Sequence, residues 1–440
     1  MSGQKLRQLG NLEKFSVARV FLGLDTCIAM AAKYTTAENT PLTKEILFPA
    51  LRTVVENHPI LGVRVEGKHT STDVAFFRLP SVDLSRVVQF SETNDVRAAL
   101  ERWFMRRFED SVEDMPLWRV EVLSDNTVIF AMHHGAGDGI SLSAFHKSLF
   151  RALQQPVYTE SSDLVTVPDK PLAPPIEAII DVRPSLWTTL DILFHALLPT
   201  YWNRDTYTWS GKPCPLTAFL QTQVRLLSFS PSQTDKFSQL CRSHNATVSS
   251  ALYELSVSVL SRLVAQTPEG AKYQTVDVEF PISLRGVTGT PDDVFHYCAS
   301  SYNSYPSLQG TAAEFSWSRA ARVATTLKTQ QTASVERLGF LSWVAGNYEK
   351  FMNGYLGRKR MVGLRISNAG RFVVEDKGPW RIGATFFGQC DSVIGPAIIM
   401  TVTGTPEGGL NFTFTWGKES VEGTFVEEFI GTFREVLLGL

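Results

Sequence analysis

The sequence predicts an α/β protein with two domains of mixed β-sheet, each carrying helices on one face. Three observations support this fold class. The chain has 440 residues, enough for two or three domains at roughly 100–200 residues each. Runs with strand-like and helix-like apolar periodicity alternate in both halves of the sequence. A proline-punctuated stretch separates the halves, so we place domains over residues 1–165 and 213–440 and a crossover linker over 166–212.

In the first half, apolar side chains three or four residues apart predict helices, and short β-rich runs predict strands. Pro49 lies inside the first helix and should kink or interrupt it. The polar turn 124–126 between the last two strands predicts a hairpin. The expected elements are, in order, a helix over Thr40–Asn57, strands over Leu61–Glu66 and Val74–Leu79, a helix over Asn94–Glu109, strands over Leu117–Leu123 and Thr127–His133, and a helix over Ile140–Gln154.

The linker region is rich in proline and is expected to hold one helix over Trp187–Leu198. Beyond it, Ser230 followed by Pro231 is typical of a helix N-terminus, because serine caps the first turn and proline fits its first position. The turn 406–409 predicts a second hairpin. The expected elements are a strand over Thr222–Phe229, helices over 231–244 and Thr247–Ala265, strands over Tyr273–Ile282, Val362–Ser367, Trp380–Phe387, Ala397–Gly404 and Leu410–Thr415, and a helix over Glu422–Leu438.

Composition argues against several classes of protein. Lys plus Arg (42) and Asp plus Glu (44) nearly cancel, so the chain lacks the broad positive charge with which proteins bind nucleic acid. Five scattered cysteines without a CxxC spacing argue against a zinc finger or a disulfide scaffold and suit a reducing compartment. The N-terminal segment lacks the apolar core of a signal peptide, and no run of about 18 apolar residues is present. We therefore expect a cytoplasmic protein without a transmembrane segment.

One segment combines residues that point to chemistry. His133 and His134 end a hydrophobic strand, a loop of small residues follows, and Asp138 and Gly139 precede an amphipathic helix. The strand would hold the imidazoles on a rigid element, and the glycines would let the backbone turn and a substrate approach. Histidine is the side chain whose pKa best suits proton transfer near neutrality. The Asp138 carboxylate could fix the loop or pair with a cation.

A histidine with an aspartate four residues later is a weak signal by itself. His69 and Asp73 repeat this spacing in a polar turn, which we interpret as structural. The segment His133–Gly139 adds a second histidine, a following glycine and the strand–loop–helix context, which together favour a functional site. The eight histidines show no HxxxH or HExxH spacing, so we expect no metal site.

Residues His133–Gly139 read HHGAGDG, and this HHxxxDG pattern between a strand and a helix resembles the signature of the CoA-dependent acyltransferase superfamily. That superfamily includes chloramphenicol acetyltransferase, plant BAHD acyltransferases, carnitine acyltransferases and peptide-synthetase condensation domains. Within it, the chain is most similar to the fungal alcohol acetyltransferase family. A DFGWG sequence, expected in the plant enzymes, is absent, and no acyl-carrier domain accompanies the motif. The other stretches that carry the resemblance are Arg7–Tyr34, Glu56–Gly67, Leu240–Leu252, Pro281–Gly286 and Ile366–Gly370.

The resemblance implies two chloramphenicol-acetyltransferase-like domains with an active-site tunnel at their interface, which CoA and the acceptor would enter from opposite sides. It implies that His134 is the general base and that His133 and Gly139 shape the loop. Asp138 would turn away from the substrate and pair with an arginine of the second domain, for which Arg285 is our candidate. No permanently bound cofactor is implied. Acyl-CoA is the expected co-substrate, with acetyl as the default.

Three further candidate sites are predicted from less specific sequence signals. Ser367 and Asn368 end a strand and could stabilise an oxyanion, although Ser-Asn-x-Gly is also an ordinary turn sequence. The basic run Arg358–Arg360 is a candidate for the CoA phosphates, but such runs are usually solvated. A helix N-terminus near Ser249 is another phosphate candidate.

The same motif leaves alternatives open. A condensation-type enzyme with a carrier-protein thioester donor would need the same histidine, as would an N-acyltransferase, and a non-catalytic relative could keep the fold. The apolar stretch near 186–198 raises the further hypothesis of weak peripheral contact with a lipid surface. We favour a monomeric enzyme that acylates the hydroxyl of a small secondary-metabolite acceptor, with no nucleic-acid partner.

Overall fold

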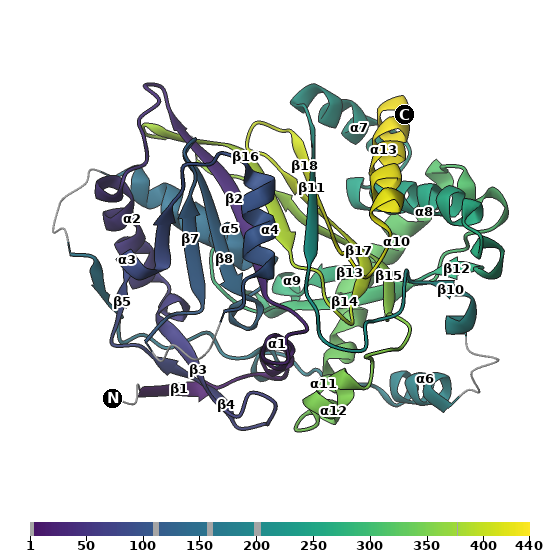
Figure 1. Cartoon of the computed structure of the whole chain (residues 1–440), viewed down its shortest axis with the longest axis horizontal. Helices are drawn as coiled ribbons and strands as arrows, with labels where there is room; N and C mark the ends of the chain where they lie inside the picture. The colour runs from purple at the N-terminus through teal and green to yellow at the C-terminus, as the bar shows by residue number, and fades with distance from the viewer. Residues whose placement is uncertain (1–3, 109–113, 156–161, 198–203, 376) are drawn as a thin grey trace.

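Two β-sheets, one in each lobe, form the framework of the chain (Figure 1). The computed structural model describes residues 4–108, 114–155, 162–197, 204–375 and 377–440. Helices lie against both sheets, and the sheets contain parallel and antiparallel neighbours. The predicted α/β class with mixed sheets is therefore confirmed. Residues 109 and 198–203, where we predicted the end of a helix and part of the linker, lie outside the described residues.

Among the described residues, the N-terminal sheet has five strands, and its centre is the buried hairpin that carries the two histidines. The hairpin pairs antiparallel from Trp118↔Met132 to Val122↔Val128, which confirms the prediction. Asn126 in its turn has φ 64°, a conformation that asparagine tolerates better than most residues. In sheet order the strands are β16 (Trp380–Gln389), β2 (Cys27–Thr36), β8 (Thr127–His133), β7 (Trp118–Val122) and β6 (Val88–Phe90).

Helices α2 (Lys44–Asn57) and α5 (Gly139–Leu153) cover one face of this sheet, and α4 (Val96–Met105) covers the other, because alternate residues of β2 pack into two separate clusters. The prediction of helices on one face is therefore wrong for this lobe. The first two pack against each other, and α4 reaches from β2 to the C-terminal lobe. α2 runs through Pro49 without a break, so the interruption that this proline favours does not occur. The proline removes one backbone donor, but the helix still buries Leu51 and its neighbours in the core, and packing of an apolar face outweighs that local loss.

In the described part of the chain, the C-terminal sheet has six strands and mixes parallel with antiparallel pairs. Ser230 caps the first helix of the lobe by accepting a hydrogen bond from the Gln233 N–H at 3.3 Å, as predicted. The covering helices are α7 (Pro231–Ser243), α8 (Val248–Gln266), α10 (Trp317–Ala333) and α13 (Gly423–Gly439). In sheet order the strands are β11 (Thr222–Phe229), β18 (Leu410–Gly417), β17 (Pro396–Gly404), β15 (Val362–Arg371), β13 (Val278–Ser283) and β14 (Ala299–Ser304).

One strand from the second half of the chain completes the N-terminal sheet. The strand predicted over Trp380–Phe387 forms as β16, but it pairs antiparallel with β2 rather than with strands of its own half. β16 also contacts β17 and β18, so it joins the two lobes. The β-rich pattern predicts the strand but not its partner, because the partner lies far away in the sequence. The strand predicted over Tyr273–Ile282 forms instead as two strands, β12 (Thr275–Val276) and β13.

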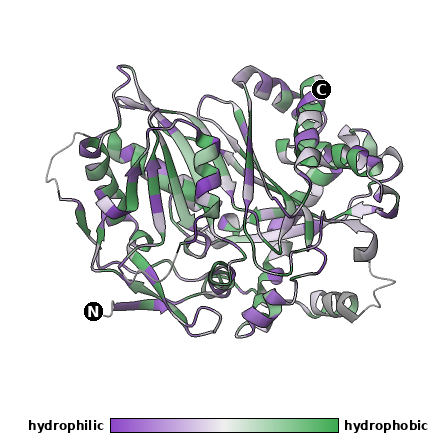
Figure 2. Cartoon of the chain, viewed as in Figure 1, coloured by the Kyte–Doolittle hydropathy of each residue, from purple (hydrophilic) through white to green (hydrophobic). Residues whose placement is uncertain are grey.

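Hydrophobic residues, green in Figure 2, run along the strands and helices of both lobes. By length and composition α8 could cross a membrane, and it is the one such helix among the described residues, but 78% of its most apolar stretch is buried inside the protein. Shorter elements complete the lobes: β1 (Gln4–Gln8), α1 (Asn11–Phe21), β3 (Val63–Gly67), β4 (Val74–Arg78), β5 (Ser81–Asp83), α3 (Leu84–Val87), β9 (Leu164–Thr166), α6 (Leu186–Leu197), β10 (Thr208–Trp209), α9 (Arg285–Thr288), α11 (Leu341–Val344) and α12 (Tyr348–Asn353).

Candidate active site

The paired histidines lie where β8 gives way to a short 3-10 turn, His134–Ala136. β8 is hydrogen-bonded to β2 along one edge and to β7 along the other, and all of its residues are buried. The position of His134 is therefore fixed by the rigid part of the sheet. Its side chain keeps 14% of its surface exposed, whereas His133 is buried.

The His133 side chain stabilises the 3-10 turn that follows it. Its Nδ1 accepts a hydrogen bond from the Gly135 N–H at 2.9 Å. A buried imidazole that is bound to its own turn fixes the backbone around the neighbouring residue. This contact fits the loop-shaping role that the resemblance implies for His133.

Asp138 caps α5 and lies in a buried cluster that joins the two lobes. Its Oδ1 accepts hydrogen bonds from the backbone N–H and the hydroxyl of Ser141, both at 2.9 Å, and from the Arg285 guanidinium at 3.1 Å. Its Oδ2 accepts a hydrogen bond from the Cys298 N–H at 3.2 Å. Both carboxylate oxygens are thus occupied by structural partners. Arg285 is the partner that we selected from the sequence.

Arg285 extends this cluster into the loop before β14. Its guanidinium donates to the carbonyl oxygens of Pro291 at 2.6 Å, Val294 at 2.9 Å and His296 at 3.2 Å. The same loop lines the cavities around His134. The Asp138–Arg285 pair therefore ties the histidine turn of one lobe to a cavity wall from the other.

His134 lines a cavity of about 270 Å³ between the lobes. Gly139 also lines it, and a Cβ at that position would lie 2.8 Å from the Phe387 ring of β16, so the close approach requires glycine. The lining residues come from both lobes: Leu12, Phe15, Arg19, Ile28, His134, Asp138, Gly139, Glu279, Pro281, Tyr297, Ala299, Ser300, Ser301, Arg337, Leu338, Leu341, Arg365, Ser367, Phe387 and Gln389.

The charged side chains of this cavity are mostly paired. Arg365 is bound to Glu279 at 2.6 Å, and Arg19 forms an ion pair with Asp25. Arg337 instead donates to Asn303 Oδ1 at 3.2 Å and, within the described residues, has no carboxylate partner. It therefore adds net positive charge to the cavity wall, which favours an anionic ligand.

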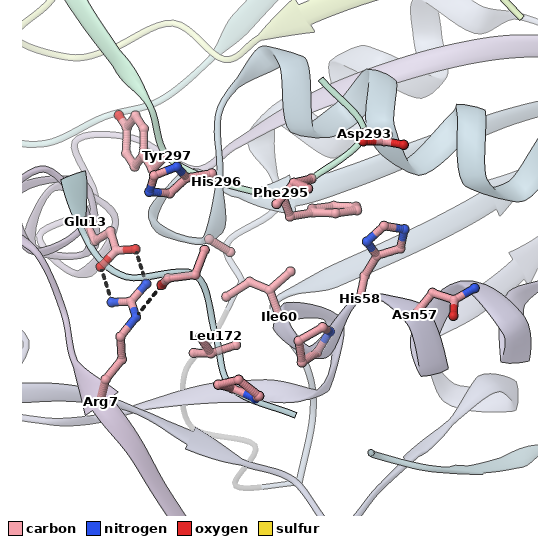
Figure 3. Close-up of a pocket in the computed structure, with 15 residues that line it drawn as sticks. Arg7, Glu13, Asn57, His58, Ile60, Leu172, Asp293, Phe295, His296 and Tyr297 are labelled. Atoms are coloured by element: carbon pink, nitrogen blue, oxygen red, sulfur yellow. Dashed lines mark hydrogen bonds and ion pairs between the residues drawn. The ribbon is translucent and has the colours of Figure 1, made fainter. Parts of the chain in front are cut away.

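A second cavity, of about 490 Å³, borders the same turn through Ala136 (Figure 3). It has a polar side, where Arg7 is bound to Glu13, and an apolar side that includes Ile60 and Phe295. Tyr297 lines both cavities. The two cavities therefore adjoin next to His134, as a tunnel with two entrances requires. An open passage between them stays a prediction.

Two residues that contact His134, Tyr297 and Asp25, were not predicted from the sequence. The Tyr297 ring stacks on the imidazole, with centroids 5.4 Å apart and 18° between the planes. Asp25 Oδ2 lies 3.9 Å from His134 Nδ1. One signal could have found Asp25, because it is the single charged residue in the apolar stretch 20–32. Tyr297 has no comparable signal.

Of the two residues proposed for an oxyanion site, the structure brings only Ser367 to the His134 cavity. Asn368 follows it on β15, and successive strand residues point to opposite faces. The Asn368 amide donates to the Ser249 hydroxyl at 2.9 Å, and its carbonyl accepts from the Gly370 N–H. Ser249, at the start of α8, therefore holds Asn368 and does not line the cavity.

The basic run proposed for CoA phosphates divides between surface and interior. Arg358 and Lys359 are exposed, whereas Arg360 is buried and donates to the carbonyl oxygens of Ser392 and Val393. None of the three is among the residues that line the His134 cavity. The run precedes β15 as a structural turn, in line with the ordinary behaviour of such runs.

The second HxxxD copy lies away from both cavities. The His69 ring packs edge-on against Phe21 with centroids 5.0 Å apart, and Asp73 accepts a hydrogen bond from Gln8. In the described ranges, no group of three or more His, Cys, Asp and Glu side chains could hold a metal ion.

Asp391, buried beside the site, gives a pH-dependent prediction. Burial raises its pKa to about 6, against the opposing effects of the Thr222 hydrogen bond and the Arg360 charge. Aspartate in the unfolded chain titrates near ~3.9, so the free energy of unfolding should fall by up to about 3 kcal/mol as the pH rises from ~4 to ~6 and stay low above. Urea unfolding at pH 4 and pH 8 should show that Asp391→Asn gains stability relative to wild type at the higher pH. If the free energies of unfolding of the variant and wild type differed equally at both pH values, the raised pKa of Asp391 would be contradicted.

The fold places His134 at the end of a rigid strand, in a cavity that both lobes line. The sequence matches the alcohol acetyltransferase family over residues 8–437. The chain therefore belongs to the alcohol acetyltransferase family. As a member of this family it is an acyltransferase that uses acyl-CoA and a small-molecule acceptor.

The chain is also similar to individual known proteins. The chain is 25% identical over 410 residues to an uncharacterized protein of Schizosaccharomyces pombe, covering 90% of this chain and 89% of that protein. It is 23% identical over 419 residues to a protein of Fusarium pseudograminearum described as a probable alcohol acetyltransferase, covering 88% and 84%. In fold it is similar to the trichothecene 15-O-acetyltransferase of Fusarium sporotrichioides, with a TM-score of 0.69, 13% identity and coverage of 98% and 94%.

Proposed function

We propose that the chain transfers an acyl group, acetyl by default, from acyl-CoA to the hydroxyl of a small secondary-metabolite acceptor, with His134 as general base. The observation that carries this proposal is the place of His134: it lines the interlobe cavity and stacks on Tyr297, which also lines the second cavity. Two substrates that approach from the two cavities would meet at one imidazole. Holding both in place is a large part of the catalysis of a bimolecular transfer.

In this proposal His134 takes the hydroxyl proton while the acceptor oxygen attacks the thioester carbon. The new carbon–oxygen bond gives a tetrahedral oxyanion. Its collapse breaks the carbon–sulfur bond, and His134 returns the proton to the sulfur, so CoA leaves as the thiol. Because Nδ1 is the nitrogen that faces Asp25, Nε2 is the nitrogen assigned to this proton transfer.

Ser367 is the residue we propose for the oxyanion. It lines the His134 cavity, and its hydroxyl is a donor that could meet the negative charge that develops on the thioester oxygen. Asn368 is left out of this proposal because its amide is bound to Ser249.

The family match is what favours acyl-CoA over a carrier-protein thioester as donor. Arg337, which has no carboxylate partner among the described residues, adds a cation to the wall of the His134 cavity, and it suits the phosphate that either donor carries on its pantetheine arm. The test is turnover with free acetyl-CoA and a panel of hydroxylated and amine acceptors, with products read by mass spectrometry. O-acetyl products that require His134 would support the proposal. Activity only with a loaded carrier protein, only with amines, or equally with His134→Ala would each favour the corresponding alternative.

The surface of α6 supports weak peripheral contact with lipid. Leu186, Trp187, Leu190 and Phe194 are exposed, Trp187 by 81% and Phe194 by 62%. Apolar side chains on one side of an exposed helix can enter the interfacial region of a bilayer. We expect the protein to float partly with phospholipid vesicles and Trp187→Asp/Phe194→Asp to float less. Equal absence of flotation for both proteins would remove this proposal.

We further propose that the protein acts as a monomer in the cytoplasm. The five cysteines are buried and unpaired, which suits a reducing compartment. Light scattering at micromolar concentration tests the monomer, and a dimer mass would contradict it.

A further inference from the structure

The carboxylate of Asp25 faces the His134 imidazole from the segment between α1 and β2. Its Oδ2, which lies 3.9 Å from His134 Nδ1, also forms the ion pair with Arg19. Its Oδ1 accepts hydrogen bonds from the Thr26 N–H at 2.8 Å and the Cys390 thiol at 2.7 Å. Asp25 is only 3% exposed. Nδ1 of His134 therefore faces a fixed carboxylate that is shielded from solvent.

Asp25 keeps its negative charge in this setting. Burial opposes ionisation, but the Arg19 cation, the nearby His134 and the hydrogen bond from Cys390 outweigh it and hold the pKa of Asp25 well below its usual range. Arg19 is itself buried and donates to the Ser392 hydroxyl at 2.8 Å. The carboxylate is thus held from several sides and remains an acceptor.

The His134 ring is also held in its plane. Tyr297 stacks on it, and the Tyr297 hydroxyl shares a hydrogen bond with Ser16 at 3.0 Å. Stacking limits tilting of the ring, so the nitrogen that faces Asp25 is set by structure. A neutral imidazole carries one proton, and a carboxylate beside one nitrogen favours the tautomer with the proton on that nitrogen.

We infer that Asp25 is a positioning residue for acyl transfer: it holds the Nδ1 proton of His134 and thereby keeps Nε2 unprotonated for the acceptor hydroxyl. This inference rests on the proposed role of His134 as base. The 3.9 Å separation exceeds the 2.7–3.2 Å of a hydrogen bond by about 1 Å. Hydrogen bonds of catalytic groups often tighten only when substrate is bound, and an approach of that size needs only a small side-chain rotation.

The test combines kinetics with a direct reading of the tautomer. Asp25→Asn should lower kcat by about 100-fold or more, since the wrong tautomer leaves no base, with KM for acetyl-CoA nearly unchanged. Nitrogen NMR of ¹⁵N-histidine protein, with the His134 signals assigned by comparison with His134→Ala, should show the Nδ1–H tautomer in wild type and its loss in the variant. Asp391→Asn, a buried aspartate in the same region that does not contact His134, is the matched control and should keep kcat and the tautomer.

Asp25→Asn leaves the buried Arg19 without its counter-charge and could unfold the protein. The double variant Arg19→Met/Asp25→Asn removes both charges, so kcat and the His134 tautomer can still be measured if the single variant does not fold. Unchanged kcat and an unchanged Nδ1–H tautomer in a folded variant that lacks Asp25 would overturn the inference while leaving His134 as base. Full activity of His134→Ala would instead overturn the proposed function, and the NMR reading of the tautomer would still stand.

Discussion

Replacing His134 by alanine is expected to lower kcat for acetyl transfer by about 10²–10⁴-fold, the usual contribution of a positioned general base. The reason is local: the imidazole lines the cavity between the lobes, and the protein offers His133 only as a buried side chain bound to Gly135. KM for acetyl-CoA should change little, because the ring takes part in proton transfer rather than in holding CoA. Initial rates of thiol release from acetyl-CoA, with a hydroxyl acceptor present, measure this loss.

His69→Ala is the matched control for that experiment. His69 stands in the second HxxxD copy, packs against Phe21 and lines neither cavity near His134. Its variant should keep wild-type rates. Thermal unfolding of both variants should stay close to wild type. A folded His134→Ala protein with full activity would show that another group accepts the proton.

Replacing Asp138 by alanine should damage stability as well as turnover. It leaves the buried Arg285 guanidinium without a counter-charge, at a cost of about 3–5 kcal/mol, and removes the N-cap of α5, at about 0.5–2 kcal/mol. Both carboxylate oxygens are occupied by partners within the protein, so the loss should also disturb the turn that carries His134. The free energy of unfolding, measured with urea, and kcat should therefore both fall.

Two further variants separate the parts of this effect. Asp138→Asn keeps an oxygen that can cap α5 but leaves Arg285 uncompensated, so its stability should lie between wild type and Asp138→Ala. Arg285→Met in the Asp138→Ala background removes the stranded charge and should recover part of the lost stability. If Asp138→Ala kept normal stability and still lost activity, Asp138 would have a direct chemical role.

Local patterns in the sequence predicted β7, β8 and α5, which carry the motif, but not α1, β2 or β14, which also border the His134 cavity. The hairpin of β7 and β8, the Ser230 cap and the terminal hairpin of β17 and β18 match their predicted places. Each depends on residues that are close together in the chain, where turn chemistry and periodicity act directly. The partner of β16 could not be found in this way, since the pairing with β2 depends on burial between segments distant in sequence.

In the candidate site, too, features set by neighbouring residues were predicted and contacts between distant segments were not. The motif His133–Gly139 predicts a histidine at a rigid strand end, a loop and a helix, because these three elements adjoin in the chain. Asp25 and Tyr297 reach His134 only through folding, from a segment far before the motif and from a loop of the other lobe. Asn368 was proposed together with Ser367, yet the alternation of β15 sends its side chain to Ser249 instead.

The most direct test of the account is a crystal structure of the protein with CoA. If His134 is the general base, the CoA sulfur should lie in the cavity between the lobes, within about 4 Å of the His134 imidazole, since reacting groups must be held close to attack distance. The second cavity, which includes Ala136 and Tyr297, should then remain open for the acceptor. CoA bound with its sulfur in a place that His134 does not line would contradict the account.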